Sequence, residues 1–220
     1  AEHPEGIAEF NSFVHGWALG NSEEAVAWFN SLPLDHPMYE KTLRGLFWGL
    51  AEADLGYSIE AFNALDLGAM RPNDFENAGS SLALSMMNTH GVEGMNRWFQ
   101  KLPEDMHVRA AEWSTINLVS QPLEEVVPWL SGYAPRSEIL HRELRQQASR
   151  WAGTSPDSAI EWAGTFASTQ TDGPLGGEMF RITAGAVGRE TLARWIAQNP
   201  GHPEIPAATE LLHAADASGR

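Results

Sequence analysis

Histidines and carboxylates are the residues of this chain best suited to chemistry at a site, and the pair Glu138–His141 has a metal-site spacing. Glu138 and His141 lie three residues apart, as ligands do in di-metal four-helix bundles. Such bundles need two helices of this kind and further glutamates placed with them, and the spacing alone does not indicate such a set. None of the eight histidines forms a His-Glu-x-x-His pattern. We therefore expect no metal centre, and a charged helix surface around these residues.

The patterns that accompany nucleophilic or phosphate chemistry are also missing. The chain has no cysteine, which excludes thiolate nucleophiles, disulfides and cysteine zinc sites. It contains no Gly-x-Ser-x-Gly and no Ser-x-x-Lys. The glycine-rich stretch 171–178 has no lysine and follows no strand pattern, so we interpret it as a loop between repeats rather than a phosphate loop. We expect no catalytic residue and no cofactor, and predict that the protein is not an enzyme.

The charge balance restricts the partners further. Lys and Arg number 14 against 29 Asp and Glu, a net charge of −15, which repels phosphate backbones and anionic lipid surfaces. A basic cluster is formed by Arg136, Arg142, Arg145 and Arg150. Glutamates are interleaved with it, and we expect helical pairs such as Glu138–Arg142 to neutralise much of it. No apolar run approaches the ~20 residues of a membrane span. We expect no nucleic-acid partner and no membrane span.

The strongest pattern is a repeat marked by aromatic residues. The chain has nine tryptophans, and one aromatic position recurs at Trp28, Phe62, Trp98, Trp129, Trp162 and Trp195, at intervals of 34, 36, 31, 33 and 33 residues. The positions eleven residues earlier are all apolar: Trp17, Ala51, Met87, Leu118, Trp151 and Ala184. So are those three residues earlier: Ala25, Ile59, Met95, Val126, Ala159 and Leu192. This period is typical of stacked helical repeats, and we expect these side chains to be buried where repeats meet, each indole N–H with a partner.

Local chemistry predicts two helices in each repeat. Apolar residues at helical spacing precede a short break with turn or cap residues, at 20–22, 54–56, 90–91, 120–122 and 154–156. Ser155 is followed by Pro156 and Asp157, which suits a hydroxyl cap, a proline in the first turn and an acid near the helix dipole. The second helix is expected to end before a proline, at Pro33, Pro103, Pro135 and Pro200.

These elements predict an all-α fold, an α-solenoid of about six helix-turn-helix repeats and a C-terminal capping helix. One domain is expected over residues 1–220, with repeats near 5–33, 37–67, 72–103, 104–134, 136–168 and 175–200 and the cap at 203–216. A single hairpin cannot bury its apolar side alone, whereas stacked neighbours bury it together.

Paired helices at this period resemble tetratricopeptide and HEAT-like repeat proteins. The resemblance covers the whole chain as architecture, and it is carried by a small residue, an aromatic and a boundary proline, such as Ala25, Trp28 and Pro33. The Trp–Leu–Gly–Tyr pattern of a tetratricopeptide first helix is absent. The resemblance implies a scaffold that binds proteins on a concave face.

Two functions therefore stay open, with a third disfavoured. The first is a non-catalytic interaction scaffold that binds a protein or peptide on the concave face of the solenoid. The second is a structural subunit of a larger assembly, for instance in the cell envelope, and a small-ligand or hydrolytic site is less favoured. Residues on first helices that lie off the repeat positions are expected to bind the partner: Arg44, Trp48, Arg109, Trp113, Arg142 and Arg145. The start at Ala1 rather than Met fits signal-peptide cleavage or simple trimming, and slightly favours an exported or periplasmic location.

Overall fold

The computed structural model describes residues 4–65, 72–170 and 173–218. Within these ranges the chain forms twelve α-helices and three short 3₁₀-helices, and no strand. This confirms the all-α prediction. The predicted 171–178 loop lies partly outside the described residues, and its last four residues already belong to a helix.

The chain divides into two compact units, Ala1–Gln121 and Pro122–Arg220. The first unit holds α1 (Pro4–Gly20), α2 (Ser22–Asn30), α3 (Tyr39–Ala53), α4 (Leu55–Asn63), α5 (Pro72–Phe99), η1 (Glu104–Met106), α6 (His107–Ser114) and η2 (Thr115–Ser120). The second holds α7 (Leu123–Ser131), η3 (Ala134–Arg136), α8 (Glu138–Thr154), α9 (Pro156–Thr169), α10 (Leu175–Ala186), α11 (Arg189–Gln198) and α12 (Ile205–Ser218). The prediction of one repeat domain over residues 1–220 stays a prediction.

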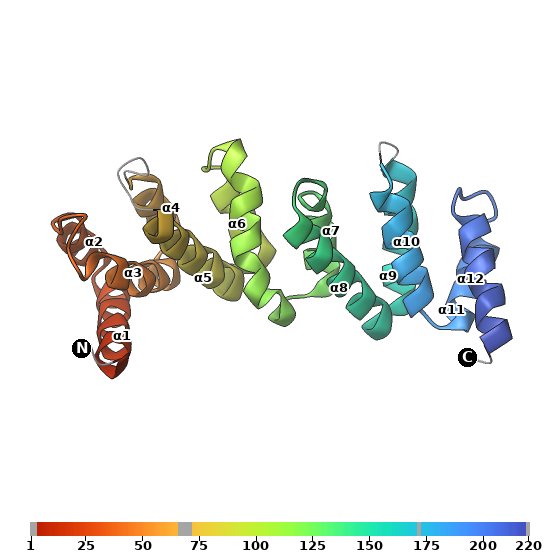
Figure 1. Cartoon of the computed structure of the whole chain (residues 1–220), viewed down its shortest axis with the longest axis horizontal. Helices are drawn as coiled ribbons and strands as arrows, with labels where there is room; N and C mark the ends of the chain where they lie inside the picture. Colours follow the sequence, from red (N-terminus) through yellow and green to blue (C-terminus); the bar gives the residue numbers. More distant parts are fainter. Residues whose placement is uncertain (1–3, 66–71, 171–172, 219–220) are drawn as a thin grey trace. The chain divides into compact units, whose positions relative to one another are not determined.

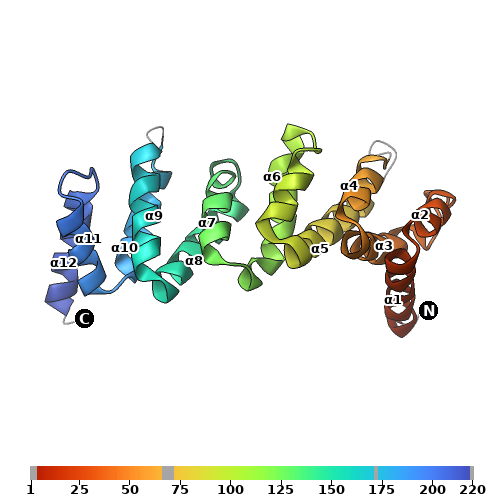
Figure 2. The same ribbon diagram turned by 180° about the vertical axis from the view of Figure 1, so that it is seen from behind.

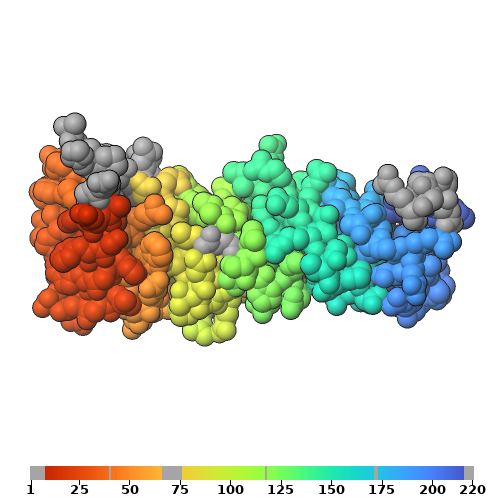
Figure 3. Space-filling model, turned by 90° about the horizontal axis from the view of Figure 1, so that it is seen from below, coloured from red at the N-terminus to blue at the C-terminus, as the bar shows by residue number. Residues whose placement is uncertain are grey.

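In each unit every helix packs against helices that closely precede or follow it in the chain. We call α1, α3, the part of α5 before Gly91, α6, α8, α10 and α12 the first helices, and α2, α4, the part of α5 after Gly91, α7, α9 and α11 the second helices. In the first unit α3 packs against α1 on one side and α5 on the other, and α5 packs against α6 (Figure 1). In the second unit α10 contacts α8, α9 and α12, and the reverse view shows α9 in front of α10 (Figure 2). The surface colours of each unit follow sequence order, so neighbours in space are near neighbours in the chain (Figure 3).

Glycines allow α1 and α3 to approach closely. A Cβ added at Gly45 would lie 2.5 Å from the backbone oxygen of Asn11, and one at Gly49 would lie 2.4 Å from that of His15. The two glycines are four residues apart and therefore share one face of α3. This contact places the outer side of α3, including Trp48, next to His15 on α1.

The helix breaks follow the predicted chemistry in most places. Asn21 and Asp54 cap α2 and α4, each accepting a backbone N–H three residues on, at 3.4 and 3.0 Å. At Gly91 the backbone adopts φ 61° and ψ −154°, which breaks α5 between its first and second parts. Ser155 differs from the expectation: Pro156 does begin α9, but the Ser155 side chain accepts no capping hydrogen bond. The break predicted at 120–122 is present, because η2 ends at Ser120 and α7 begins at Leu123.

The repeat positions form the core. Of the eighteen aromatic and apolar positions of the repeat, only Trp17, Trp28 and Trp162 are half-buried, and the others are buried. Phe62 lies 5.7 Å from Phe47 and 5.3 Å from Trp98, measured between ring centroids. Not every indole N–H has the expected hydrogen-bond partner. The buried Nε1 of Trp98 has no acceptor in the described part of the chain. Aromatic rings thus fill the space between helices as predicted. Trp98 is buried by ring packing although its indole N–H makes no hydrogen bond.

Candidate partner-binding site

Neighbouring first helices are joined by polar contacts between residues 37 positions apart. His15 contacts Glu52, Trp113 contacts Glu76, and His141 contacts Glu178. The repeat period is near 33 residues, so each contact joins equivalent helices with an offset of about one helical turn. In each case the glutamate carboxylate is contacted by two side chains, through hydrogen bonds or an ion pair. We call each glutamate with its two partners a carboxylate cluster, and there are three among these contacts.

The first cluster orders Trp48 on the surface of α3. The indole N–H of Trp48 donates to Oε1 of Glu52 at 2.6 Å, and Nε2 of His15 lies 3.0 Å from the other carboxylate oxygen. The ring of Trp48 also packs on the His15 ring, with centroids 5.2 Å apart. Trp48 remains 39% exposed, so it offers a large apolar surface in one fixed orientation. Arg44, one turn earlier on α3, is exposed.

The second cluster joins α5 and α6. Glu76 accepts the indole N–H of Trp113 and pairs with the guanidinium of Arg109. Arg109 lies over the Trp113 ring, 5.9 Å from its centroid. A Cβ at Gly79 would come within 2.2 Å of that ring, so the indole packs directly on the backbone of α5.

Trp113 is only 8% exposed, and its ring lies 6.3 Å from that of Trp98. Its contribution is therefore to the core and to holding Glu76, and little of its surface faces solvent. Arg109 is the exposed member of this cluster.

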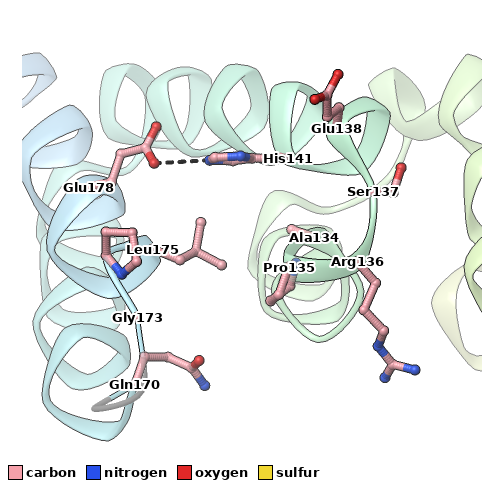
Figure 4. A pocket seen from close by; sticks show the side chains of 11 residues that line it. Ala134, Pro135, Arg136, Ser137, Glu138, His141, Gln170, Gly173, Leu175 and Glu178 are labelled. Atoms are coloured by element: carbon pink, nitrogen blue, oxygen red, sulfur yellow. Dashed lines mark hydrogen bonds and ion pairs between the residues drawn. The ribbon is translucent and has the colours of Figure 1, made fainter.

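The third cluster joins α8 and α10. Nε2 of His141 lies 3.0 Å from Oε2 of Glu178, and Nε of Arg145 lies 3.4 Å from Oε1 (Figure 4). Glu178 is thus held by two basic side chains from the neighbouring first helix. His141 and Glu178 also form one wall of a hollow of about 630 Å³, whose further lining comes from η3, the start of α8 and the start of α10.

That hollow has an apolar centre and a polar rim. Pro135 and Leu175 face each other across it, while the side chains of Arg136 and Glu138 point away from its centre (Figure 4). A second hollow of about 320 Å³ lies beside it and is lined by Arg142, Arg145, Gln146 and Ile182.

No family model, no curated protein and no solved structure matches this chain.

Residues 4–65, 72–170 and 173–218 contain no group of three or more His, Asp or Glu side chains placed to hold a metal ion. None of the helices in those ranges has both the length and the apolar character needed to cross a membrane.

The six residues expected to bind a partner are distributed over these clusters and hollows. Trp48, Arg109, Trp113 and Arg145 are donors in the three carboxylate clusters. Arg142 lines the second hollow, and Arg44 is exposed on α3. Their role in binding stays a prediction.

The expected Glu138–Arg142 pair is not formed, and Arg142 makes no ion pair within the described part of the chain. Both side chains are exposed, where such a pair adds little stability.

The sequence patterns gave no role to the three glutamates of the clusters, Glu52, Glu76 and Glu178, or to His15. They marked His141 only for its spacing from Glu138. A signal was present: complementary side chains recur 37 residues apart, and Asp157 with Arg194 on α9 and α11 adds a fourth case at 3.0 Å. Complementary side chains separated by one repeat period plus one helical turn are therefore the sequence signal for these contacts.

Proposed function

We propose that this chain is a non-catalytic interaction scaffold, a helical-repeat solenoid that binds a protein or peptide partner across its first helices. The observation that carries the proposal is the set of three carboxylate clusters. Each one holds exposed side chains, among them Trp48, Arg109 and Arg145, in a fixed orientation. Side chains ordered before binding lose less entropy when a partner docks, and Trp and Arg are enriched where binding energy concentrates.

The test is capture of a partner by the tagged chain from its native organism, with soluble and envelope fractions analysed separately by mass spectrometry. We expect a stoichiometric partner that is lost when Trp48→Ala and Arg44→Gln are combined. Far-ultraviolet circular dichroism checks that the variant keeps its helices. Arg97→Gln is the matched control, because Arg97 is an exposed arginine of the same unit that pairs with Glu93 away from the clusters. Retention of the partner by the double variant would contradict this binding face.

A second function, a subunit held permanently in an assembly, is favoured by the N-terminal hairpin. Trp17 and Trp28 are half-buried, with ring centroids 5.4 Å apart, and Phe13 beside them is 63% exposed. The equivalent rings in the following hairpins are buried, apart from Trp162, which is half-buried. Light scattering coupled to size exclusion tests this function, since it predicts self-association of the isolated chain that Phe13→Ser weakens. A stable monomer at all concentrations would argue against it.

A further inference from the structure

The two hollows lined by residues of α8 and α10 are related by the contacts of Glu178, and we call the two together the α8–α10 groove. The first hollow is bounded by Pro135, Leu175 and His141, and the second by Arg142, Arg145 and Ile182. The contacts of Glu178 with His141 and Arg145 connect them, because His141 lines the first hollow and Arg145 lines the second. The groove lies entirely within the second unit.

The charges of the groove differ from those of the chain as a whole. Eight of the 14 Lys and Arg residues fall in Pro122–Arg220, although the protein carries −15 overall. Glu178, the acid at the centre of the groove, is already paired with His141 and Arg145. Arg142 is exposed and makes no ion pair in the described ranges. The second hollow therefore presents two arginines, of which only Arg145 is paired with an acid in the described ranges, in an otherwise acidic protein.

The first hollow supplies an apolar contact next to these charges. Pro135 and Leu175 face each other across this hollow (Figure 4), and its volume of about 630 Å³ can hold an apolar side chain. Ile182 is half-buried and lines the second hollow. Ligand sites commonly combine such an apolar centre with a few polar groups that fix orientation.

We propose that the α8–α10 groove binds an acidic peptide segment of a partner protein. An aliphatic or aromatic side chain of the peptide occupies the first hollow between Pro135 and Leu175. A neighbouring Asp or Glu side chain pairs with Arg142 and with the exposed part of Arg145, as guanidinium and carboxylate geometries match. This inference rests on the proposed scaffold function and specifies the chemistry of its partner.

Charge complementarity selects an acidic peptide over a nucleic acid. A phosphate backbone carries its charge along its whole length and would meet the repulsion of a chain with a net charge of −15. A short acidic segment places its charges only beside the arginines. Its apolar side chain also uses the first hollow, which a phosphate backbone leaves empty.

The experiment is selection from a random-peptide display library on the complete chain. We expect enrichment of peptides in which Asp or Glu residues flank Leu, Ile, Met or Phe. A synthetic peptide of the enriched sequence is then labelled, and its dissociation constant is measured by fluorescence anisotropy. Affinity should fall as NaCl is raised, because exposed charge pairs are screened.

Variants assign the binding to the groove. Arg142→Gln and Leu175→Ala should each weaken the enriched peptide about three- to tenfold, while Arg97→Gln in the first unit leaves its affinity unchanged. Far-ultraviolet circular dichroism confirms that each variant is folded. Selection of neutral or basic peptides, affinity that is indifferent to Arg142→Gln, or tighter groove-dependent binding of single-stranded DNA would overturn the inference.

The two proposals fail in different ways. If no acidic peptide is selected but a native partner is still captured and depends on Trp48, only the inference about the α8–α10 groove is wrong. If the native capture also fails, the scaffold function itself is contradicted.

Discussion

Tyr133 is a residue whose ionisation reports directly on its surroundings. It follows α7, and its ring lies 5.5 Å from that of Trp129. Burial raises the pKa of the Tyr133 phenol above its ordinary value of 10.0, and the nearby Arg136 guanidinium opposes this in part. We expect the difference in phenolate absorbance between wild type and Tyr133→Phe to titrate above pH 10.0. In urea the absorbance difference should titrate at the ordinary pKa of a tyrosine phenol.

The same shift predicts a dependence of stability on pH. Because the folded-state pKa of Tyr133 is raised, folding favours its neutral form. The contribution of the neutral Tyr133 phenol to the free energy of unfolding is complete below the unfolded-state pKa. It is lost as pH rises through the folded-state pKa. Wild type should therefore lose more stability than Tyr133→Phe above pH 10.0, as measured by urea unfolding. Parallel losses in the two proteins would show that the phenol is not desolvated.

Because the repeat positions differ in burial, truncation of their side chains to alanine should lower the free energy of unfolding by different amounts. Phe62 is fully buried between Phe47 and Trp98, so Phe62→Ala should cost about 3–5 kcal/mol of unfolding free energy. Trp28 is half-buried at the edge of the first unit, and Trp28→Ala should cost less although it removes a larger side chain. Urea unfolding followed by circular dichroism compares the two. An equal or larger loss for Trp28→Ala would mean that the N-terminal hairpin is covered in solution.

At the scale of elements, the break in α5 depends on one glycine. Gly91 has φ 61° and ψ −154°, a conformation that is essentially restricted to glycine. Its Cβ would also lie 3.0 Å from Oε1 of Gln121. Gly91→Ala should therefore lower the free energy of unfolding by about 1–3 kcal/mol, because the strain persists in the folded state.

Gly153 in α8 provides the matched control. It is helical, and a Cβ added there meets nothing within 4 Å. Gly153→Ala should raise stability by about 0.5–1 kcal/mol, since alanine loses less conformational entropy in a helix. If both substitutions stabilise the protein, residue 91 cannot have the backbone conformation described.

The helices could be predicted because their signals are local and repeated. Residues such as Ala25 and Met95 recur at the spacing of a buried helix face, and turn residues mark most of the breaks. The carboxylate clusters depend instead on the register between helices that are far apart in sequence. The intervals between aromatic positions vary from 31 to 36 residues, so the period alone does not fix which side chains meet across α8 and α10. Between α1 and α3 the register depends on close backbone contacts such as those of Gly45 and Gly49, which no sequence interval marks.

At the scale of the whole molecule, net charge is the property with the broadest consequence. A chain with −15 repels itself more when it is compact than when it is extended. Salt shortens the range of this repulsion, with a Debye length that falls from about 30 Å at about 0.01 M to about 8 Å at about 0.15 M. Exposed ion pairs such as Arg194–Asp157 are weakened by the same screening, but each contributes at most about 1 kcal/mol.

Relief of repulsion should therefore dominate, and the thermal midpoint should rise by about 2–5 °C over that range of NaCl concentration. Circular dichroism melts in NaCl and in KCl measure the effect and check that it does not depend on the cation. A midpoint that falls with salt would mean that the ion pairs between neighbouring helices, the carboxylate clusters included, outweigh the repulsion. In that case the clusters stabilise the fold itself, and variants such as Glu178→Gln would lower the midpoint most at low salt.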